Sequence, residues 1–396
     1  MKHRIVVLGA GYAGAFAAGS LARRLSPADT EITVVNAAPE FVERMRLHQL
    51  AIGQDLAFRQ LADVFAGTGV RLRLARVTGV DPERRIVAVT GVDGDDELAY
   101  DTLLYALGSS VAQHGVPGVA EHAFDVTGLS SALRLRERLA GLGAGGRVLV
   151  VGEGLTGIEA ATEFAESRPD LSVALAARGE PGAWLSPRAR RHLHRAFDRF
   201  GIAVHAHTRI EAVEPARVLA ADGTALPADV TVWAAGFAVH PIAAASGLDV
   251  AATGQIAVDR SMRSVSHPDV YAAGDSAYAI GGNGRPLPMS CASAGMTTMQ
   301  ATAAIVARLT GSEVPEAGLK YHGNHISLGR CDAIIQRVDG DVRSVSWYLG
   351  GRTAAWLKAG VLTGAGWGIT HPTFGLPKRR RRLTTARDRA GARASA

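Results

Sequence analysis

Two glycine-rich turns hold the residues of this chain that are best suited to binding and chemistry. One runs from Gly9 to Gly14 after the apolar stretch 5–8, and the other runs from Gly152 to Gly157 after the apolar stretch 148–151. In a G-x-G-x-x-G turn the first glycine makes the tight bend, the second admits a pyrophosphate, and the third lets helix and strand pack closely. The N–H groups at the start of the helix then face the anion. Two such turns predict two dinucleotides bound side by side, as hydride transfer between them requires.

The elements that must position these turns repeat along the chain. Each turn is followed by a helical stretch and a second strand, at 31–35 in the first half and 171–176 in the second. Blocks beginning at Arg76 and Arg209 then each give a strand, an acid-proline turn, a second strand, and an apolar strand that ends in small residues and glycine. Each half therefore predicts a parallel βαβ core with an antiparallel insertion and a closing strand.

Composition narrows the class of protein. The chain has 396 residues, of which 46 are glycine, and a formal net charge of +6, so we expect two or three domains with many strand-to-helix turns. Residues 378–396 contain eight basic side chains and one acidic side chain. The remainder is close to neutral and lacks the basic surface of a nucleic-acid-binding protein. We expect the basic tail to be solvated and disordered, although it could also dock on anionic lipid.

The cysteines and the apolar stretches exclude further classes. Cys291 and Cys331 lie far apart and form no C-x-x-C pair, which argues against a zinc cluster and against a neighbouring redox-active dithiol. We therefore expect no metal site. No stretch has the length of a transmembrane helix, and the chain enters a strand directly, so we expect no signal peptide and a cytoplasmic protein.

The sequence resembles the flavoproteins with two dinucleotide-binding domains, most closely the type II NADH:quinone oxidoreductase-like branch of the pyridine nucleotide-disulfide reductase superfamily. The resemblance is carried by the two glycine turns, by 104–108 and 233–236 at the ends of the repeats, and by 270–275. It extends from Ile5 to about Leu309, and the stretch 321–330 matches more loosely. It implies FAD in the first domain, NAD(P)H in the second, and a first domain completed by chain that returns after the second.

The resemblance predicts an α/β fold with two Rossmann-like dinucleotide-binding domains, each with an antiparallel insertion, and a small C-terminal α+β region. The expected segments are 1–115 and 237–310 for the FAD-binding domain, 116–236 for the NAD(P)H-binding domain, 311–377 for the C-terminal subdomain and 378–396 for the basic tail.

Carried over residue by residue, the resemblance assigns a set of cofactor contacts. In the first domain these are Gly9, Gly11, Tyr12, Ala13, Gly14, Asn36, Arg46, Val77, Ala106 and Gly108. In the second domain they are Gly152, Gly154, Leu155, Thr156, Gly157, Arg178, Ala235 and Gly236. In the returning chain they are Gly274, Asp275, Ser290, Cys291 and Ala292.

Two of these assignments have ordinary structural alternatives. Asp275 would hydrogen-bond the ribityl chain or a phosphate of FAD, but Asp is also a common helix N-cap. The backbone at Ser290–Ala292 would face the flavin pyrimidine edge at the start of a long helix, where the helix dipole stabilises negative charge. We expect Cys291 itself to be a buried small hydrophobic residue rather than a redox group.

The sequence departs from the family pattern at both strand ends where an acidic residue usually binds the adenosine ribose. The first half has Asn36, which can bond a hydroxyl only without charge assistance. The second half has Ala177 followed by Arg178. Losing a carboxylate and gaining a guanidinium suits a 2′-phosphate, so this position favours NADPH slightly over NADH. A solvated arginine is the alternative.

Glu159 and His48 are the candidate catalytic residues. Glu159 stands two residues beyond the second glycine turn, and the resemblance places it near flavin and nicotinamide, where it could orient the cofactor or relay protons. Its place in the first helical turn is also favourable for any carboxylate. Arg46 could reach the FAD phosphates, and His48 or Gln49 could face the isoalloxazine or the acceptor, although a lone histidine is commonly packed or solvated.

We therefore predict that the protein passes a hydride from NAD(P)H to flavin N5 and then electrons to a quinone or similar organic acceptor. One alternative acceptor is a soluble redox protein or a biosynthetic small molecule, and another possibility is a flavin-binding regulator or scaffold. The stretch 354–362 could form a short interfacial helix that touches a membrane. Core packing or an oligomer contact would explain the same stretch.

Overall fold

A computed structural model describes residues 1–315, 318–372 and 380–384. Its larger sheet has seven strands in the order β20-β8-β1-β2-β5-β6-β7. The strands are β1 (His3–Leu8), β2 (Thr30–Asn36), β5 (Arg71–Asp81), β6 (Ile86–Gly91), β7 (Gly94–Ala99), β8 (Thr102–Tyr105) and β20 (Val270–Ala272). The pairs from β20 to β5 are parallel, and β5, β6 and β7 form the antiparallel insertion. The chain that returns late in the sequence thus supplies the edge strand β20.

The second half repeats this plan in a five-stranded parallel sheet with the order β10-β17-β11-β12-β13. Its strands are β10 (Ala123–Phe124), β11 (Arg147–Val151), β12 (Ser172–Ala176), β13 (Ala203–His205) and β17 (Val230–Trp233). The insertion forms a separate antiparallel sheet of β14 (Ile210–Glu214), β15 (Arg217–Ala220) and β16 (Ala225–Pro227). The central strands of both sheets read as continuous apolar runs because helices or further sheets cover both faces.

The longer helices begin and end at residues that the sequence marks. They are α1 (Tyr12–Arg24), α5 (Leu129–Ala140), α6 (Leu155–Ser167), α7 (Pro187–Phe200), α9 (Cys291–Thr310) and α10 (Arg352–Thr370). Ser186 and Ser290 cap α7 and α9 with their side chains, and Gly201 and Gly311 end the same helices at φ 64° and 67°. Serine satisfies free N–H groups at a helix start, and glycine adopts the left-handed backbone at low energy.

Short elements connect these parts. They are β3 (Glu40–Phe41), β4 (Arg59–Gln60), β9 (Ser109–Val111), β18 (Phe237–Val239), β19 (Ile256–Ala257) and β21 (Ala277–Tyr278), with α2 (Leu47–Ala51), α3 (Leu61–Phe65), α4 (Val119–His122), α8 (Ile242–Ala245) and 3-10 turns at Arg44–Arg46 and Gly274–Ser276. Strand β9 pairs with β18, so the two chain crossings between the halves are hydrogen-bonded to each other.

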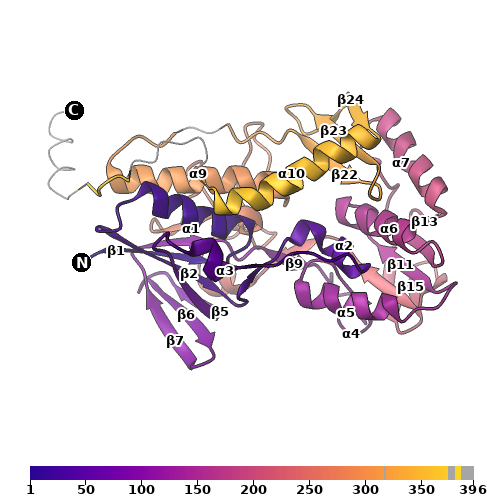
Figure 1. The fold of residues 1–396 in the computed structure, drawn as a ribbon, viewed down its shortest axis with the longest axis horizontal. Coiled ribbons are helices and arrows are strands. Elements are labelled where there is room, and N and C mark those ends of the chain that lie inside the picture. Colours follow the sequence, from indigo (N-terminus) through magenta and orange to yellow (C-terminus); the bar gives the residue numbers. More distant parts are fainter. Residues whose placement is uncertain (316–317, 373–379, 385–396) are drawn as a thin grey trace.

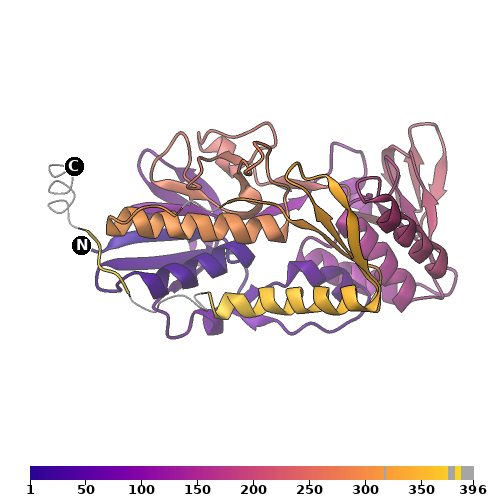
Figure 2. The ribbon, with the colours of Figure 1, turned by 90° about the horizontal axis from the view of Figure 1, so that it is seen from above.

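The C-terminal region is a three-stranded antiparallel sheet followed by α10. Its strands are β22 (Gly323–Ser327), β23 (Ala333–Val338) and β24 (Ser344–Gly350). In Figures 1 and 2, α10 starts beside this small sheet and runs back along the molecule to α1 in the first half. Pro372, just after α10, packs at Gly19 of α1, where a Cβ would meet the proline ring. The C-terminal region thereby bridges the two halves.

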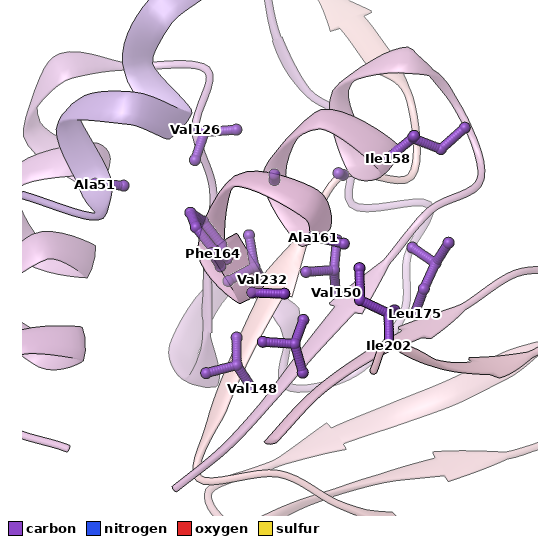
Figure 3. Packing of buried hydrophobic residues seen from close by; sticks show 14 of the residues in the cluster. Ala51, Val126, Val148, Val150, Ile158, Ala161, Phe164, Leu175, Ile202 and Val232 are labelled. Atoms are coloured by element: carbon purple, nitrogen blue, oxygen red, sulfur yellow. The ribbon is translucent and has the colours of Figure 1, made fainter. Parts of the chain in front are cut away.

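One core joins the halves directly. Leu47, Leu50 and Ala51 of α2 belong to the same buried cluster as Val150, Phe164 and other residues of the second half. Figure 3 shows Ala51 on the side of α6 that carries Phe164. A helix encoded in the first half is therefore packed into the second, and this apolar contact fixes the position of α2 against α6.

Residues 380–384 differ from the expectation of a disordered tail, although residues 380–382 are exposed as expected. Arg381 forms a parallel bridge to Leu25, and Arg382 pairs with Asp29 at 2.8 Å. The backbone N–H of Thr384 donates to Leu309 O. This short segment is held because it satisfies backbone groups at the end of α1, and the rest of the predicted tail lies outside the described residues. Within the described ranges, no helix combines the length and the apolar character needed to cross a bilayer.

Candidate active site

The two glycine turns close in the same way. A Cβ on Gly14 would collide with Gly9 O, and a Cβ on Gly157 would collide with Gly152 O. Each first glycine also lies against the end of its closing strand, since a Cβ on Gly9 would meet Ala106 O at 2.5 Å and one on Gly152 would meet the backbone of Ala234. The prediction that these glycines allow a tight bend and close helix-strand contact is confirmed at both turns.

The second glycine of each turn faces open space instead. A Cβ on Gly11 or Gly154 would have no atom of the described chain within 4 Å. Both glycines are N-caps in extended backbone, and no side-chain hydrogen bond caps α1 or α6 in the structure. The N–H groups at these two helix starts, which include those of Tyr12, Ala13, Leu155 and Thr156, are thus left for an anion. This arrangement fits a pyrophosphate at each turn.

Each turn is braced to the neighbouring strand end, but from opposite sides. In the first half Asn36 Oδ1 accepts from Ala10 N at 2.9 Å, and Asn36 Nδ2 donates to Ala38 O at 2.7 Å. In the second half the loop residue Glu153 reaches across, and its Oε2 accepts from Gly179 N at 2.5 Å. Arg178 beside it is exposed. Asn36 therefore holds the loop itself, and Glu153 puts a carboxylate where the second strand end lacks one.

Asp275 lies at the junction of three segments. Ser109 Oγ donates to Asp275 Oδ2 at 2.7 Å, and Arg44 Nη1 lies 3.8 Å from the same oxygen. Arg44 also donates to Ser109 O at 2.7 Å and stacks over the ring of Phe237. The alternative of a simple helix cap does not fit, because Asp275 belongs to a short 3-10 turn without a side-chain cap bond. The sequence did not indicate Arg44, because only the fold shows that this arginine lies beside Asp275.

Tyr12 supports a bound group next to the first turn. Its hydroxyl is buried without a hydrogen-bond partner among the described residues, and its ring packs edge-on against Phe41. Burial raises the pKa of this phenol, and the carboxylate of Glu43 acts in the same direction. Native structures leave few buried hydroxyls unsatisfied, so Tyr12 fits a site that a ligand such as FAD completes.

Cys291 and its neighbours start α9 at the same site. Ser290 caps the helix by accepting from Ser293 N at 3.2 Å, which leaves Cys291 as the first helical residue. The surrounding protein raises the pKa of the Cys291 thiol, although solvent reaches the side chain. Both cysteines are free. A thiol with a raised pKa is a poor nucleophile at neutral pH, which argues against a redox role, whereas the expectation of a buried side chain is wrong because solvent reaches it.

Glu159 forms a buried ion pair that the sequence does not reveal. Its Oε1 accepts from Lys358 Nζ on α10 and from Ser327 N of β22 at 2.9 Å, and Lys358 also donates to His325 O at 3.0 Å. The two charged side chains are only 10% and 13% exposed. Burial lowers the pKa of Lys358 to about 7. Helix α10 thus places a lysine beside α6, the helix that follows the second glycine turn.

His48 is buried in α2. It is 5% exposed, and its Nε2 has no hydrogen-bond partner within the described chain. Burial, followed by the charges of Lys358 and Arg46, lowers its pKa to about 3. This burial favours the packed alternative, because α2 belongs to the core that joins the halves. A contact of His48 with the isoalloxazine or the acceptor stays a prediction.

The remaining predicted contacts lie after strand ends, within a strand or in helical segments. Ala106 and Gly108 follow β8, and Ala235 and Gly236 follow β17, with His114 Nε2 bonded to Ala235 O at 2.7 Å. Gly274 N is held by Thr297 Oγ1 of α9 at 3.0 Å. Val77 and Ala292 lie on β5 and α9, and Arg46 pairs with Glu43 at 3.3 Å. No cluster of His, Cys, Asp and Glu suited to a metal ion occurs among the described residues.

Comparison with known proteins agrees with this geometry. Residues 3–305 match the family described as pyridine nucleotide-disulphide oxidoreductase. The chain belongs to this family. Membership implies FAD and a nicotinamide cofactor, and it confirms the prediction of an oxidoreductase with two dinucleotide-binding domains. The family name refers to a disulphide, but this chain has only two cysteines, both free and in separate segments.

Two relatives show which branch of the family this chain resembles. An NADH dehydrogenase-like protein of Mycobacterium tuberculosis is 33% identical over 315 residues, which cover 73% of this chain and 76% of the relative. A demethylphylloquinone reductase of Synechocystis is 25% identical over 350 residues, which cover 84% of this chain and 86% of the relative. The prediction of an NADH dehydrogenase-like branch is confirmed by these matches.

Solved structures share the fold. The NDH2 of Plasmodium falciparum in complex with NADH superposes with a TM-score of 0.77 at 14% identity, covering 96% of this chain and all of that one. A ferredoxin reductase of Rhodopseudomonas palustris gives a TM-score of 0.71 at 26% identity, covering 86% of this chain and 83% of that one. The same fold thus occurs in an NDH2 and in a ferredoxin reductase.

Proposed function

We propose that this protein transfers a hydride from NAD(P)H to bound FAD and passes the electrons on to a quinone. The observation that carries the proposal is the matched pair of glycine turns, each with an open second glycine and an uncapped helix start. One such turn would support a single nucleotide. Two of them, in halves linked by β9 and β18, support two nucleotides held by one rigid frame.

FAD, when bound, supplies the redox chemistry by accepting a hydride and releasing electrons to a second substrate. The protein's own residues bind and orient. The N–H groups beyond Gly11 and Gly154 hold the two pyrophosphates, and Asp275, kept in place by Ser109 and Arg44, holds polar groups of the first nucleotide. Orientation of two reactants in one site removes much of the entropy barrier to their reaction.

We propose that Glu159 and Lys358 border the reacting groups. Glu159 lies in the first turn of α6, directly after the second glycine turn, and Lys358 neutralises its carboxylate in a buried setting. A lysine whose pKa is lowered to about 7 can hold or release a proton near neutral pH. The pair can therefore give a proton to the reduced acceptor, and its net charge then falls from zero to −1 until a proton returns.

A lipophilic acceptor is supported by the outer face of α10. The side chain of Lys358 points inward from this helix, while Trp356 is 73% exposed and Val361 and Trp367 are also exposed. Such an apolar surface on a helix suits a membrane interface or a hydrophobic substrate. The Synechocystis relative is named as a reductase of a quinone, demethylphylloquinone, which supports the same class of acceptor here.

The experiment is an anaerobic stopped-flow titration of the purified holoprotein. NADH or NADPH should bleach the flavin absorbance within milliseconds to seconds, and a short-chain naphthoquinone or benzoquinone should restore it with one quinone consumed per nicotinamide. Failure of both nicotinamides to bleach bound flavin faster than they bleach free flavin would overturn the proposal and favour a regulator or scaffold. Bleaching that only a ferredoxin-like protein reverses would replace the quinone by a soluble redox partner, as in the Rhodopseudomonas structure.

The preference for NADPH stays a proposal that rests on Arg178. Its guanidinium is exposed at the second strand end, where it would contact the 2′-phosphate of a bound NADPH. The carboxylate of Glu153 beside Gly179 acts against it, because a carboxylate accepts ribose hydroxyls and repels a phosphate. The ratio of kcat/KM for the two nicotinamides measures which side chain dominates.

We further propose a peripheral contact with anionic membranes through α10. Trp356 and Trp367 would insert at the interface, where indole rings are favourable, and the basic residues after position 377 would add electrostatic attraction. Co-sedimentation with vesicles of anionic phospholipid should persist when the chain is cut before Lys378 and should fall in Trp356→Glu. An intact chain that stays in the supernatant at low ionic strength would end this proposal.

A further inference from the structure

Two buried polar atoms have no partner at the contact between α2 and α6. Glu163 of α6 is 1% exposed and its Oε2 has no hydrogen-bond partner among the described residues, and the same holds for Nε2 of His48 on α2. Buried groups of this kind are rare in native proteins and commonly mark an ordered water. Neither residue belongs to the glycine turns or to the Glu159–Lys358 pair.

Glu163 stands one helical turn beyond Glu159, so both carboxylates lie on the same side of α6. Its other oxygen, Oε1, accepts from Gln54 Nε2 and from Ser167 Oγ at 3.2 Å. Gln54 and Ser167 are both partly exposed. The carboxyl group therefore lies between surface amide and hydroxyl groups on one side and the active-site carboxylate on the other.

The charges around this contact favour a neutral carboxyl. Burial raises the pKa of Glu163 and Glu166 on the same helix adds to the effect, whereas Ser167, Arg330 and Gln54 act against it. On the facing helix, burial with Lys358 and Arg46 keeps His48 uncharged. A protonated carboxyl has an O–H to donate, and a neutral imidazole has one nitrogen that accepts. Donor and acceptor thus lie on two helices that pack against each other, and the charge of Lys358 acts on His48.

We propose that Glu163, oriented by Gln54, and His48 hold an internal water and form a proton route from the Ser167 hydroxyl along α6 to the Glu159–Lys358 pair. The inference rests on the proposed function, in which NAD(P)H, one proton and a quinone give NAD(P)⁺ and a hydroquinone. The hydride brings two electrons and one proton, and the hydroquinone needs a second proton that only solvent can supply. The closed α2–α6 core excludes bulk water, so this proton needs fixed groups to carry it.

The matched variants are Glu163→Gln, which keeps the shape of the side chain but cannot exchange a proton, and Glu137→Gln, which changes an exposed carboxylate of α5. Bleaching by NAD(P)H needs no solvent proton and should stay within twofold of the unmodified protein in both variants. Reoxidation by quinone should slow at least tenfold in Glu163→Gln alone. The solvent deuterium isotope effect on that step should rise in the same variant.

Two readouts do not depend on turnover. Infrared spectra of the holoprotein should retain the C=O band of a protonated carboxyl above the ordinary glutamate pKa, and that band should be absent in Glu163→Gln. The folded state keeps a proton that the unfolded state loses, so the free energy of unfolding should fall as pH rises above the ordinary glutamate pKa. Glu163→Gln should flatten that fall, and Glu137→Gln should not.

Separate results decide the two proposals. Normal bleaching with unchanged quinone reoxidation in Glu163→Gln, and no missing infrared band, would overturn the route and leave the proposed function intact. Absent bleaching in the unmodified protein would overturn the proposed function itself. If Glu163→Gln does not fold, Ser167→Ala serves as the second variant, because it removes the hydroxyl at the surface end of the route. Unchanged reoxidation in that variant would also overturn the route.

Discussion

In both halves of the molecule a side chain holds the glycine turn against the end of the second strand, but the side chain comes from a different position in each half. Leu8 pairs with Val35 and Tyr105 in the first sheet, and Val151 pairs with Ala176 and Trp233 in the second. This register makes Ala10 equivalent to Glu153. It also makes Asn36 equivalent to Ala177.

In both halves a side chain links the glycine turn to the end of the neighbouring strand. It comes from the strand end in the first half and from the turn in the second. In the first half the strand-end residue Asn36 reaches the loop N–H of Ala10, and in the second half the loop residue Glu153 reaches the strand-end N–H of Gly179. Each contact gives one backbone N–H an acceptor, that of Ala10 in the first half and that of Gly179 in the second, and an N–H without a partner is unfavourable. Which residue supplies it is free to change, and with that change the site receives a neutral amide in one half and a carboxylate in the other.

The largest expected effect separates the halves by cofactor. Gly11→Val and Gly154→Val fill open space in extended backbone, so both proteins should fold. Gly11→Val should weaken FAD binding on the order of a thousandfold, about 4 kcal/mol. Gly154→Val should keep the yellow flavin but lose bleaching by NAD(P)H.

Visible spectra and flavin titration check both outcomes. Gly128→Val is the control, because Gly128 caps α5 with extended backbone and open space but faces neither proposed nucleotide. Loss of flavin in Gly154→Val, with retention in Gly11→Val, would reverse the assignment of the halves.

The second effect tests the contact where the halves meet. The folded-state pKa of His48 is lowered to about 3, so between that value and the ordinary value near 6.5 only the unfolded chain takes up the proton. Stability should therefore fall as pH drops through this window, by on the order of 3 kcal/mol between about pH 6.5 and 4. Urea unfolding at several pH values measures it. His48→Gln should lose most of this dependence, and the exposed His122→Gln should retain it; equal slopes in both would contradict the assignment.

The third effect sharpens the difference in charge. Glu153→Gln removes the carboxylate of the second half but keeps an acceptor for Gly179 N, and it should shift kcat/KM towards NADPH by about tenfold, or about 1.4 kcal/mol. Arg178→Ala should shift the ratio in the opposite direction. Steady-state kinetics with both nicotinamides provide the ratio, and a shift of the same sign in both variants would refute the opposed roles.

The smallest effect concerns the neutral bridge of the first half. Asn36→Ala leaves Ala10 N without its acceptor and should lower stability by about 1 kcal/mol. Asn36→Asp keeps the acceptor and should recover part of that loss. Thermal unfolding of the holoprotein compares the two. A larger loss in Asn36→Asp than in Asn36→Ala would show that the bridge depends on the bond from Nδ2 to Ala38 O.

Local signals predicted much of this arrangement. The glycine turns, the repeated insertions and the returning strand at Val270–Ala272 are short patterns whose geometry depends on neighbours in sequence. Arg44 and Arg46 are a counterexample, because two arginines two positions apart look alike until the 3-10 turn decides which one lies beside Asp275. The burial of His48 is likewise set by packing, and no local pattern indicated it.

By itself the sequence determined the two nucleotide-binding halves, because only glycine avoids the collisions at Gly9, Gly14, Gly152 and Gly157. The spacing of these glycines can be read directly from the sequence. Only the tertiary structure decided the electrostatic partners. Lys358 lies 199 residues from Glu159 in the chain, and Asp275 lies 166 from Ser109. Charges and hydrogen bonds act through space, so their pairing is fixed by how helices and sheets pack and not by the spacing of residues along the chain.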